Sequence, residues 1–291
     1  MIAGSLTKSG AIVKSEVLKV NSHQSFREND YLAREEPLEI RLEYGPERER
    51  KIQNVSITMR TPGNDLELAL GFLFSEGIIR SAEEISTSGQ KVISCAENKE
   101  NILKICLKEH IQPVLKNMER NFYTTSSCGV CGKASLKAIR TLIPKNLAEP
   151  EALEISAKIL HQLPQLLRRK QNVFEETGGL HASAIFDTKG NLIMLREDVG
   201  RHNALDKLIG AAFSQNQLPL NNIILLLSGR ISFELVQKAA MAGIQIVAAV
   251  GAPSSLAVEL AREFKITLVG FLSSSRFNVY NAAHRIKLDT I

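Results

Sequence analysis

Three aliphatic runs in the C-terminal part of the chain restrict its fold more than any other feature. They occupy residues 223–227, 244–250 and 266–271, and none of them alternates regularly between apolar and polar residues. Such runs predict strands that are covered on both faces, and the segments between them are long enough for helices of about ten residues. A strand–helix–strand–helix–strand series forms a parallel sheet with right-handed crossovers. The sequence therefore predicts an α/β fold.

Strands of a different kind precede this series. Residues 38–44 and 55–59 alternate between apolar and polar residues, which predicts strands with one face in water. Gly45-Pro46 lies between them and predicts a short loop that joins antiparallel strands. Residues 102–107 read as a further strand. We therefore expect a small α+β unit in the N-terminal part of the chain.

Helix ends are predicted from capping residues and prolines. Asn64 with Glu67 three residues later is typical of a capping box that opens a helix, and Asn203 with Asp206 repeats the pattern. Another helix, whose apolar face includes Leu160 and Leu163, is expected to end at Pro164 because proline interrupts helical hydrogen bonding.

The chain length predicts two domains. At 291 residues the chain is longer than one core usually serves, although one large α/β unit is the alternative. We expect a smaller α+β domain at residues 1–135 and an α/β domain at residues 136–291. The second domain would begin its sheet with a hairpin of residues 180–187 and 192–196. Residues 1–25 have no predicted element.

Hydropathy and charge limit the classes of partner. No apolar run approaches the roughly 18 residues of a membrane span, and the N-terminus lacks the apolar core of a signal peptide. We therefore expect a cytoplasmic protein without a membrane partner. The formal net charge is +5, but the basic residues are spread along the chain, with residues 168–170 the one tight cluster. No nucleic-acid partner is predicted.

Loops rich in Gly, Ser and Arg follow the predicted strands. They comprise residues 197–202, 228–230, 251–255 and 272–276. In an open parallel sheet, ligands bind beyond the carboxyl ends of the strands. Loops that lead into helices present free N–H groups and a partial positive charge, which favour an anion. Arginine can bind phosphate oxygens through two parallel hydrogen bonds. The sequence predicts a site for a phosphate-bearing ligand, unless the Gly and Ser residues only form turns and the arginines are surface residues.

The candidate residues at this edge differ in their expected roles. Those expected to bind the anion are Ser228, Gly229, Arg230, Arg201 and Arg276. Those expected to orient the ligand or to transfer a proton are Asp198, His202 and His181. A histidine in a strand or at a helix start is also often a packing or capping residue.

Cys128 and Cys131 form a Cys-x-x-Cys motif in a Ser- and Gly-rich segment. The motif has three common uses, as half of a zinc site, as a redox couple or as a nucleophilic thiol. A zinc site would need Cys95 and Cys106, which lie in strand-like segments rather than on a second knuckle. A helix start after the motif, with Lys133 beside it, would favour a thiolate. A thiolate in such a loop can accept sulfur and hold it as a persulfide.

Five motifs occur in order along the chain. They are Ser-Ser-Cys-Gly-Val-Cys-Gly at 126–132, Thr-Gly-Gly-Leu-His-Ala at 177–182, Glu-Asp-Val-Gly-Arg-His-Asn-Ala-Leu-Asp-Lys at 197–207, Ser-Gly-Arg at 228–230 and Phe-Asn-Val-Tyr at 277–280. Together they resemble the FdhD family of formate dehydrogenase accessory sulfurtransferases. The resemblance extends from roughly residue 55 to residue 285.

The resemblance implies a sulfur carrier. Such a protein takes sulfur from a cysteine desulfurase and passes it to the molybdenum cofactor, in its bis molybdopterin guanine dinucleotide form, before insertion into formate dehydrogenase. Cys128 would carry the persulfide, with Cys131 as its partner and no resident metal. The stretch matching the family's cofactor-binding segment is Phe271, Leu272, Ser273, Ser274, Ser275 and Arg276. We expect a homodimer, because the ligand to be carried is large and has two lobes.

The resemblance also implies a cytidine-deaminase-like, three-layer α/β/α sheet domain, which raises deamination as an alternative. Zinc deaminases use H-x-E followed by P-C-x-x-C. Here Ser183 stands where the glutamate is needed after His181, and the cysteine pair precedes the histidine. Deamination is therefore disfavoured. A zinc-stapled nucleic-acid-binding module is the remaining alternative, and it would require stoichiometric zinc and salt-sensitive binding.

Overall fold

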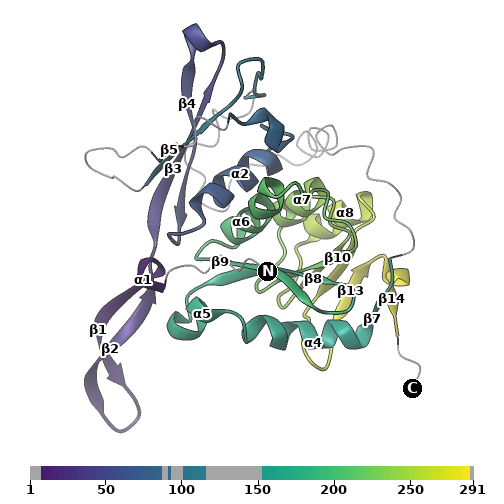
Figure 1. Cartoon of the computed structure of the whole chain (residues 1–291). Helices are drawn as coiled ribbons and strands as arrows, with labels where there is room; N and C mark the ends of the chain where they lie inside the picture. Colours follow the sequence, from purple (N-terminus) through teal and green to yellow (C-terminus); the bar gives the residue numbers. More distant parts are fainter. Residues whose placement is uncertain (1–7, 87–90, 93–100, 116–152, 289–291) are drawn as a thin grey trace.

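A six-stranded sheet lies at the centre of the molecule (Figure 1). The computed structural model describes residues 8–86, 91–92, 101–115 and 153–288. The strand order is β13-β12-β11-β10-β8-β9. The strands are β8 (His181–Asp187), β9 (Leu192–Asp198), β10 (Ile223–Leu227), β11 (Ile246–Ala249), β12 (Thr267–Gly270) and β13 (Asn278–Asn281). The three aliphatic runs form the parallel neighbours β10, β11 and β12, as predicted. β8 and β13 flank them in antiparallel pairing.

Helices cover both faces of this sheet. The helices α6 (Arg201–Ser214), α7 (Phe233–Met241) and α8 (Ser255–Glu263) pack on one face, and α4 (Ala157–Arg168) packs on the other (Figure 1). Successive residues of β10 point to opposite sides, so Leu225 joins the core under α6 to α8 and Ile224 joins the core under α4. The α/β prediction is confirmed, with three layers around a sheet buried on both faces.

A second sheet is built by the N-terminal part of the chain. Its order is β4-β3-β6-β5, with β3 paired antiparallel to β4 and parallel to β6. The strands are β3 (Glu36–Tyr44), β4 (Lys51–Arg60), β5 (Lys91–Val92) and β6 (Ile102–Cys106). The helix α2 (Asp65–Ser75) follows β4. The strands predicted at 38–44, 55–59 and 102–107 are therefore present.

The helix α2 packs directly against α6 through two glycines. A Cβ atom on Gly71 would lie 1.9 Å from the Asp206 carbonyl oxygen, and one on Gly210 would lie 1.8 Å from the Glu67 carbonyl oxygen. Only glycine permits two helix backbones to approach so closely. One apolar cluster consequently contains residues of β3, α2, α6 and the central sheet. The domain boundary expected between residues 135 and 136 lies outside the described residues.

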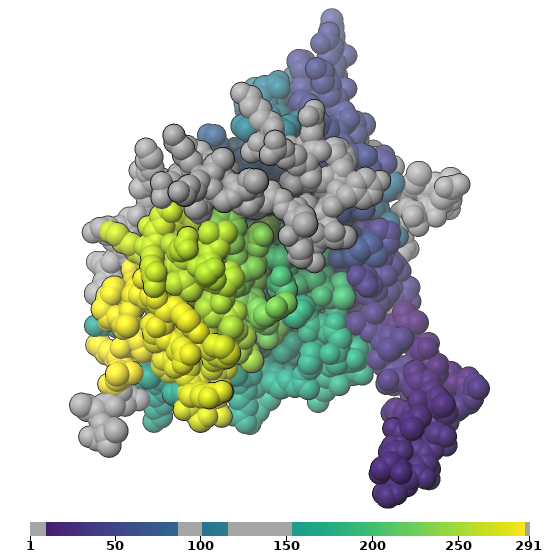
Figure 2. Space-filling view, turned by 180° about the vertical axis from the view of Figure 1, so that it is seen from behind, coloured from purple at the N-terminus to yellow at the C-terminus, as the bar shows by residue number. Residues whose placement is uncertain are grey.

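A long hairpin extends from the molecule at the N-terminal end. Its strands β1 (Ile12–Val20) and β2 (Ser25–Ala33) are paired along their full length and project from the body (Figures 1 and 2). No element was predicted for most of this region. The smaller elements elsewhere are α1 (Lys8–Ala11), α5 (Asn172–Thr177), β7 (Ile155–Ser156), β14 (Ile286–Lys287) and 3₁₀ turns at Glu47–Glu49, Ala82–Glu84 and Ala283–Arg285. Among the described residues, no helix combines the length and apolar character needed to cross a membrane.

Both predicted capping boxes are wrong. Asn64 precedes α2 but adopts a left-handed conformation and caps no N–H group with its side chain, while Glu67 pairs with Arg196. Asn203 and Asp206 lie inside α6, which begins at Arg201. Both are buried, and their side chains form hydrogen bonds with Met59 and Ser75 in the N-terminal part of the chain. Contacts across the fold have overridden the local capping pattern in each case.

The predicted helix end at Pro164 is also wrong. α4 continues through Pro164 to Arg168. Proline removes one hydrogen bond from a helix interior. Here Leu160, Leu163 and Leu167 are all buried against the central sheet, so continuing the helix buries apolar surface that ending it would expose.

Candidate functional site

The loops that follow β9, β10, β11 and β12 lie at one edge of the central sheet. β8 runs antiparallel to both β9 and β10, so these two strands point the same way as β11 and β12. Backbone hydrogen bonds join the loops, from Gly251 N to Gly229 O and from Phe271 N to Gly251 O, each at 3.1 Å. The convergence that the sequence predicts is therefore present. The start of β8 reaches the same edge, where Ala182 N donates to Ser228 Oγ at 2.8 Å.

Two glycines let the loops pack this closely. A Cβ atom on Gly251 would lie 2.8 Å from Gly229 O and 2.9 Å from Arg230 N, which are backbone atoms that cannot easily move aside. A Cβ atom on Gly229 would lie 3.1 Å from His181 Nδ1. The glycines therefore hold the arginine-bearing loop against the start of β8.

The arginines of this edge have no carboxylate partners in the part of the chain that the structure describes. None of Arg201, Arg230 and Arg276 forms an ion pair there, and the buried Nε atom of Arg201 has no hydrogen-bond partner. Arg201 is the first residue of α6, where free N–H groups add partial positive charge. A buried donor without a partner costs free energy. An anionic oxygen from a ligand would satisfy this donor, so the residues fit a phosphate group.

The two histidines of the edge are held neutral. Burial, with Lys238 and Arg201 nearby, lowers the pKa of His202 from 6.5 to about 4, against the opposing effect of Glu234. Burial and then Arg201 also lower the pKa of His181. His202 Nε2 lies 3.0 Å from Ser232 Oγ. The histidines therefore act as neutral hydrogen-bonding groups near pH 7 and leave the positive charge to the arginines.

The sequence analysis did not identify Ser232 or Glu234 at this edge. Ser232 precedes the first residue of α7, and Glu234 lies in the first turn. A serine directly before an apolar helical run is a common helix-start signal and could have indicated the position of Ser232. Its contact with His202 depends on the packing of α7 beside α6, which no local pattern reveals.

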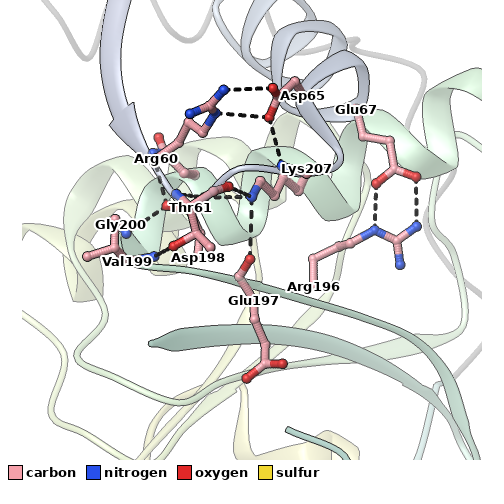
Figure 3. Close-up of polar contacts among 12 residues, drawn as sticks. Arg60, Thr61, Asp65, Glu67, Arg196, Glu197, Asp198, Val199, Gly200 and Lys207 are labelled. Carbon is pink, nitrogen blue, oxygen red and sulfur yellow. Dashed lines mark hydrogen bonds and ion pairs between the residues drawn. The ribbon is translucent and has the colours of Figure 1, made fainter. Parts of the chain in front are cut away.

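Asp198 is deeply buried and fully bonded (Figure 3). Its Oδ2 atom accepts from Lys207 Nζ at 2.7 Å and from Thr61 N at 3.1 Å. Its Oδ1 atom accepts from Gly200 N at 2.8 Å and from Asn203 Nδ2 at 3.2 Å. The carboxylate thus fixes the turn that leads into α6. These contacts give Asp198 a positioning role, and direct contact with a ligand stays a prediction.

The segment after β12 presents some of its side chains and buries others. Leu272 is 1% exposed and belongs to the core under α4, so its side chain is not available to a ligand. Phe271, Ser274, Ser275 and Arg276 are exposed. Ser273 holds the turn, because its Oγ atom accepts from Arg276 N at 3.1 Å and its carbonyl oxygen bonds to His161 Nδ1 at 2.9 Å.

The cysteine motif lies outside the described residues. Cys128, Cys131 and Cys95 all fall in segments that the structure does not describe. Cys106 is the described cysteine, and it is buried in β6 with its sulfur 3.6 Å from Glu43 Oε2. Burial, followed by the negative charge of Glu43, raises the pKa of the Cys106 thiol. No cluster of three or more potential metal ligands occurs among the described residues.

Known proteins resemble this chain along almost its whole length. A family model described as the FdhD/NarQ family matches residues 33–287. Proteins named sulfur carrier protein FdhD from Streptomyces avermitilis and Mycobacterium tuberculosis are 47% and 46% identical to it. The matches cover 94% and 95% of this chain and 95% and 99% of those proteins. A relative of the same name from Sulfurisphaera tokodaii is 40% identical over 94% of this chain.

A solved structure agrees in fold. The crystal structure of a candidate formate dehydrogenase accessory protein from Desulfotalea psychrophila superimposes with a TM-score of 0.67 and 23% sequence identity, covering 95% of this chain and 100% of that one. Because the family model and the relatives cover nearly the whole length, the chain belongs to the FdhD/NarQ family.

Proposed function

We propose that this protein is a sulfur carrier for formate dehydrogenase maturation. It receives sulfur from a cysteine desulfurase as a persulfide on Cys128. It passes the sulfur to the bis molybdopterin guanine dinucleotide form of the molybdenum cofactor, before insertion into the formate dehydrogenase apoenzyme. The relatives named sulfur carrier protein are up to 47% identical to this chain over the aligned residues, and their name supports the carrier role. We expect it to act as a cytoplasmic homodimer.

The arrangement of arginines at the sheet edge is the structural observation that carries this proposal. The client cofactor bears pyrophosphate groups, and the edge presents Arg201, Arg230 and Arg276 without carboxylate partners among the described residues. The loop at 228–230 and the exposed residues of the segment 271–276 would hold the phosphates. His181 and His202 would donate or accept hydrogen bonds as neutral groups.

Sulfur loading is a thiol exchange. The Cys128 thiolate attacks the terminal sulfur of the persulfide on the desulfurase, and the sulfur–sulfur bond of the donor breaks. The desulfurase cysteine leaves as a thiolate, and Cys128 becomes the persulfide. No external oxidant or reductant is consumed in this step. Cys131 is close enough in sequence to share the sulfur or to assist its release.

Intact-mass measurement tests the loading step. After incubation with a cysteine desulfurase and cysteine, the wild-type protein should gain one sulfur atom and Cys128→Ala should gain none. Cys106→Ala is the matched control, because Cys106 is buried and its pKa is raised. It should load like the wild type. Sulfur loading of Cys128→Ala at the wild-type level would contradict the proposed role of Cys128.

Titration calorimetry tests the ligand edge. Arg230→Gln and Arg276→Gln should each weaken binding of guanosine 5′-diphosphate about tenfold or more, because each removes a bidentate phosphate contact. Their melting temperatures should change little, since neither arginine side chain has a hydrogen-bond or ion-pair partner among the described residues, and the backbone bonds of Arg276 do not depend on its side chain. Arg48→Gln replaces an exposed arginine in the 3₁₀ turn between β3 and β4 and should bind as the wild type does. Equal affinity in all four proteins would exclude the edge as the phosphate site.

A further inference from the structure

The β1–β2 hairpin has open edges and an apolar surface. In the described part of the chain its two strands pair only with each other, and the hairpin projects from the body (Figures 1 and 2). Of the fourteen large apolar side chains that are exposed among the described residues, six lie in this hairpin: Val13, Leu18, Val20, Phe26, Tyr31 and Leu32. An isolated two-stranded hairpin is only marginally stable in water, and an open edge is a template for another strand. The hairpin therefore has the features of an interaction element.

Hydrogen bonds at the two ends of the hairpin show which backbone groups face the open edge of β1. Arg34 N donates to Ala11 O at 2.8 Å, and Asn21 N donates to Gln24 O at 3.0 Å. In an antiparallel pair, every second residue of a strand bonds to the partner strand. The register is unbroken between these two ends, so the odd-numbered residues of β1 bond to β2. The residues of β1 whose N–H and C=O groups point to the open edge are Ile12, Lys14, Glu16, Leu18 and Val20.

The sequence of β1 is complementary to its own reverse about Ser15. The residues at equal distances on either side are Lys14 and Glu16, then Val13 and Val17, then Ile12 and Leu18. When two copies of β1 lie antiparallel about a two-fold axis through Ser15, each residue faces its counterpart in the other copy. Each lysine then faces a glutamate, and each apolar residue faces an apolar residue. Opposite charges and apolar side chains that face each other across two strands stabilise a sheet.

The backbone and the charges of β1 both suit this pairing. The axis brings the outward-facing residues of the two edges opposite each other, so about eight backbone hydrogen bonds form between the copies. Within its own hairpin Glu16 bonds to Arg27 at 3.3 Å, but these side chains are 58% and 77% exposed. Such an exposed ion pair is weak and does not prevent Glu16 from meeting a second cation.

The open edge of β2 does not offer an equivalent pairing. A two-fold axis at the centre of this strand, through Asn29, places Glu28 of each copy opposite Asp30 of the other. An axis through Glu28 or through Asp30 places two identical carboxylates opposite each other. Like charges that face each other across strands are destabilising. The charge pattern therefore favours β1 as the edge that pairs.

We propose that the edge of β1 is the interface of a homodimer, in which two β1 strands pair antiparallel about Ser15 and form one four-stranded sheet. This inference deepens the proposed function, which expects a homodimer, but the pairing does not depend on sulfur transfer. The same surface is used by both copies, as in most homodimers. Leu18 of one copy faces Ile12 of the other, so the tip of each hairpin reaches the base of its partner. With nine residues in each of its strands, the hairpin supplies much of the roughly 20–30 residues that a standard interface takes from each side.

Sedimentation equilibrium of charge variants of the full chain tests the pairing. Lys14→Glu and Glu16→Lys should each raise the dimer dissociation constant about tenfold or more, because each replaces two attractive pairs with two repulsive ones. An equimolar mixture of the two variants should dimerise like the wild type, since every carboxylate again faces an ammonium group. The double variant Lys14→Glu/Glu16→Lys should also recover the dimer. Lys189→Glu makes the same charge change in the exposed turn between β8 and β9 and is the matched control.

A cysteine at the axis tests the register. Ser15 would face Ser15 of the other copy in a pair without hydrogen bonds, where the Cα atoms are about 4.5 Å apart, which suits a disulfide. After oxidation with diamide, Ser15→Cys should form a covalent dimer, and peptide mass mapping should link position 15 to itself. Ser22→Cys, in the turn of the hairpin, is the control and should not form this link.

The possible outcomes separate this pairing from other modes of association. A wild type that stays monomeric, or a dimer whose dissociation constant is unchanged in Lys14→Glu and in Glu16→Lys, would overturn the proposal. Weak dimers of the single variants without recovery in their mixture would also overturn it, whereas recovery in the mixture would support it. Circular dichroism verifies that each variant is folded. Sulfur loading of Cys128 is measured separately by intact mass, so failure of the pairing and failure of the proposed function are distinguishable.

Discussion

Replacing Lys207 with methionine should destabilise the protein strongly. The Lys207 ammonium lies 2.7 Å from Asp198 Oδ2 and 2.8 Å from Thr61 O, and the two charged side chains are 1% and 0% exposed. Methionine has a similar length, so the main change is the loss of charge. Breaking a buried ion pair from one side leaves the other charge uncompensated, which costs about 3–5 kcal/mol. The melting temperature should fall by roughly 10 °C.

Urea denaturation followed by circular dichroism measures this effect. Adding Asp198→Asn to Lys207→Met should recover part of the loss, because it removes the stranded carboxylate. The two substitutions should then differ from additivity by about 1–3 kcal/mol. Arg196→Met is the comparison, since the side chains of its pair with Glu67 are 15% and 22% exposed, so breaking this pair should cost less than breaking the fully buried one. A loss below about 1 kcal/mol in Lys207→Met, or strict additivity, would refute this account of the pair.

Three further effects are expected. Gly210→Ala should cost about 3 kcal/mol or more in thermal melts, because its Cβ atom would lie 1.8 Å from Glu67 O, whereas Gly10→Ala, with nothing within 4 Å, should be tolerated. Since the folded-state pKa of His202 is about 4 and its unfolded value is 6.5, stability should fall as the pH drops through this window. The loss should reach roughly 2–3 kcal/mol, and His202→Gln should show a flatter profile of urea midpoint against pH. Iodoacetamide should leave Cys106 unmodified in the native protein because the thiol is buried with a raised pKa, and peptide mass mapping would reveal any labelling.

The position of the ligand edge could be predicted from the sequence because it depends on chain direction. Once residues 223–227, 244–250 and 266–271 are assigned as parallel strands, their carboxyl ends must lie together. The loops that carry Arg230 and Arg276 then meet without any knowledge of side-chain contacts. The match in the structure follows from topology, which aliphatic patterns encode strongly.

The contacts that fix α6 could not be predicted in this way. Asn203 is 145 residues from Thr58, with which it shares a hydrogen bond, and Asp206 is 131 residues from Ser75. A capping box is a local sequence pattern, and Asn203 with Asp206 matches it whether these side chains cap a helix or form contacts with distant parts of the chain. The choice is made by α2, which approaches α6 so closely that these side chains become buried. The β1–β2 hairpin was also not predicted from the sequence. Its strands carry apolar and charged residues on both faces, so they lack the regular alternation that indicates a strand.

Thr61 connects the N-terminal part of the chain to the ligand edge (Figure 3). Its N–H group donates to Asp198, its carbonyl oxygen accepts from Lys207, and its hydroxyl oxygen accepts from Val199 N at 3.2 Å. Asp198 in turn holds the N–H of Gly200, directly before Arg201. The geometry of the first turn of α6 is therefore set partly by Thr61, which directly follows β4 of the N-terminal sheet. Thr61 forms these bonds through its backbone as well as its side chain. A movement of the N-terminal sheet would therefore be transmitted to Arg201. The position of Arg201 at the ligand edge thus depends on the N-terminal sheet as well as on the central sheet.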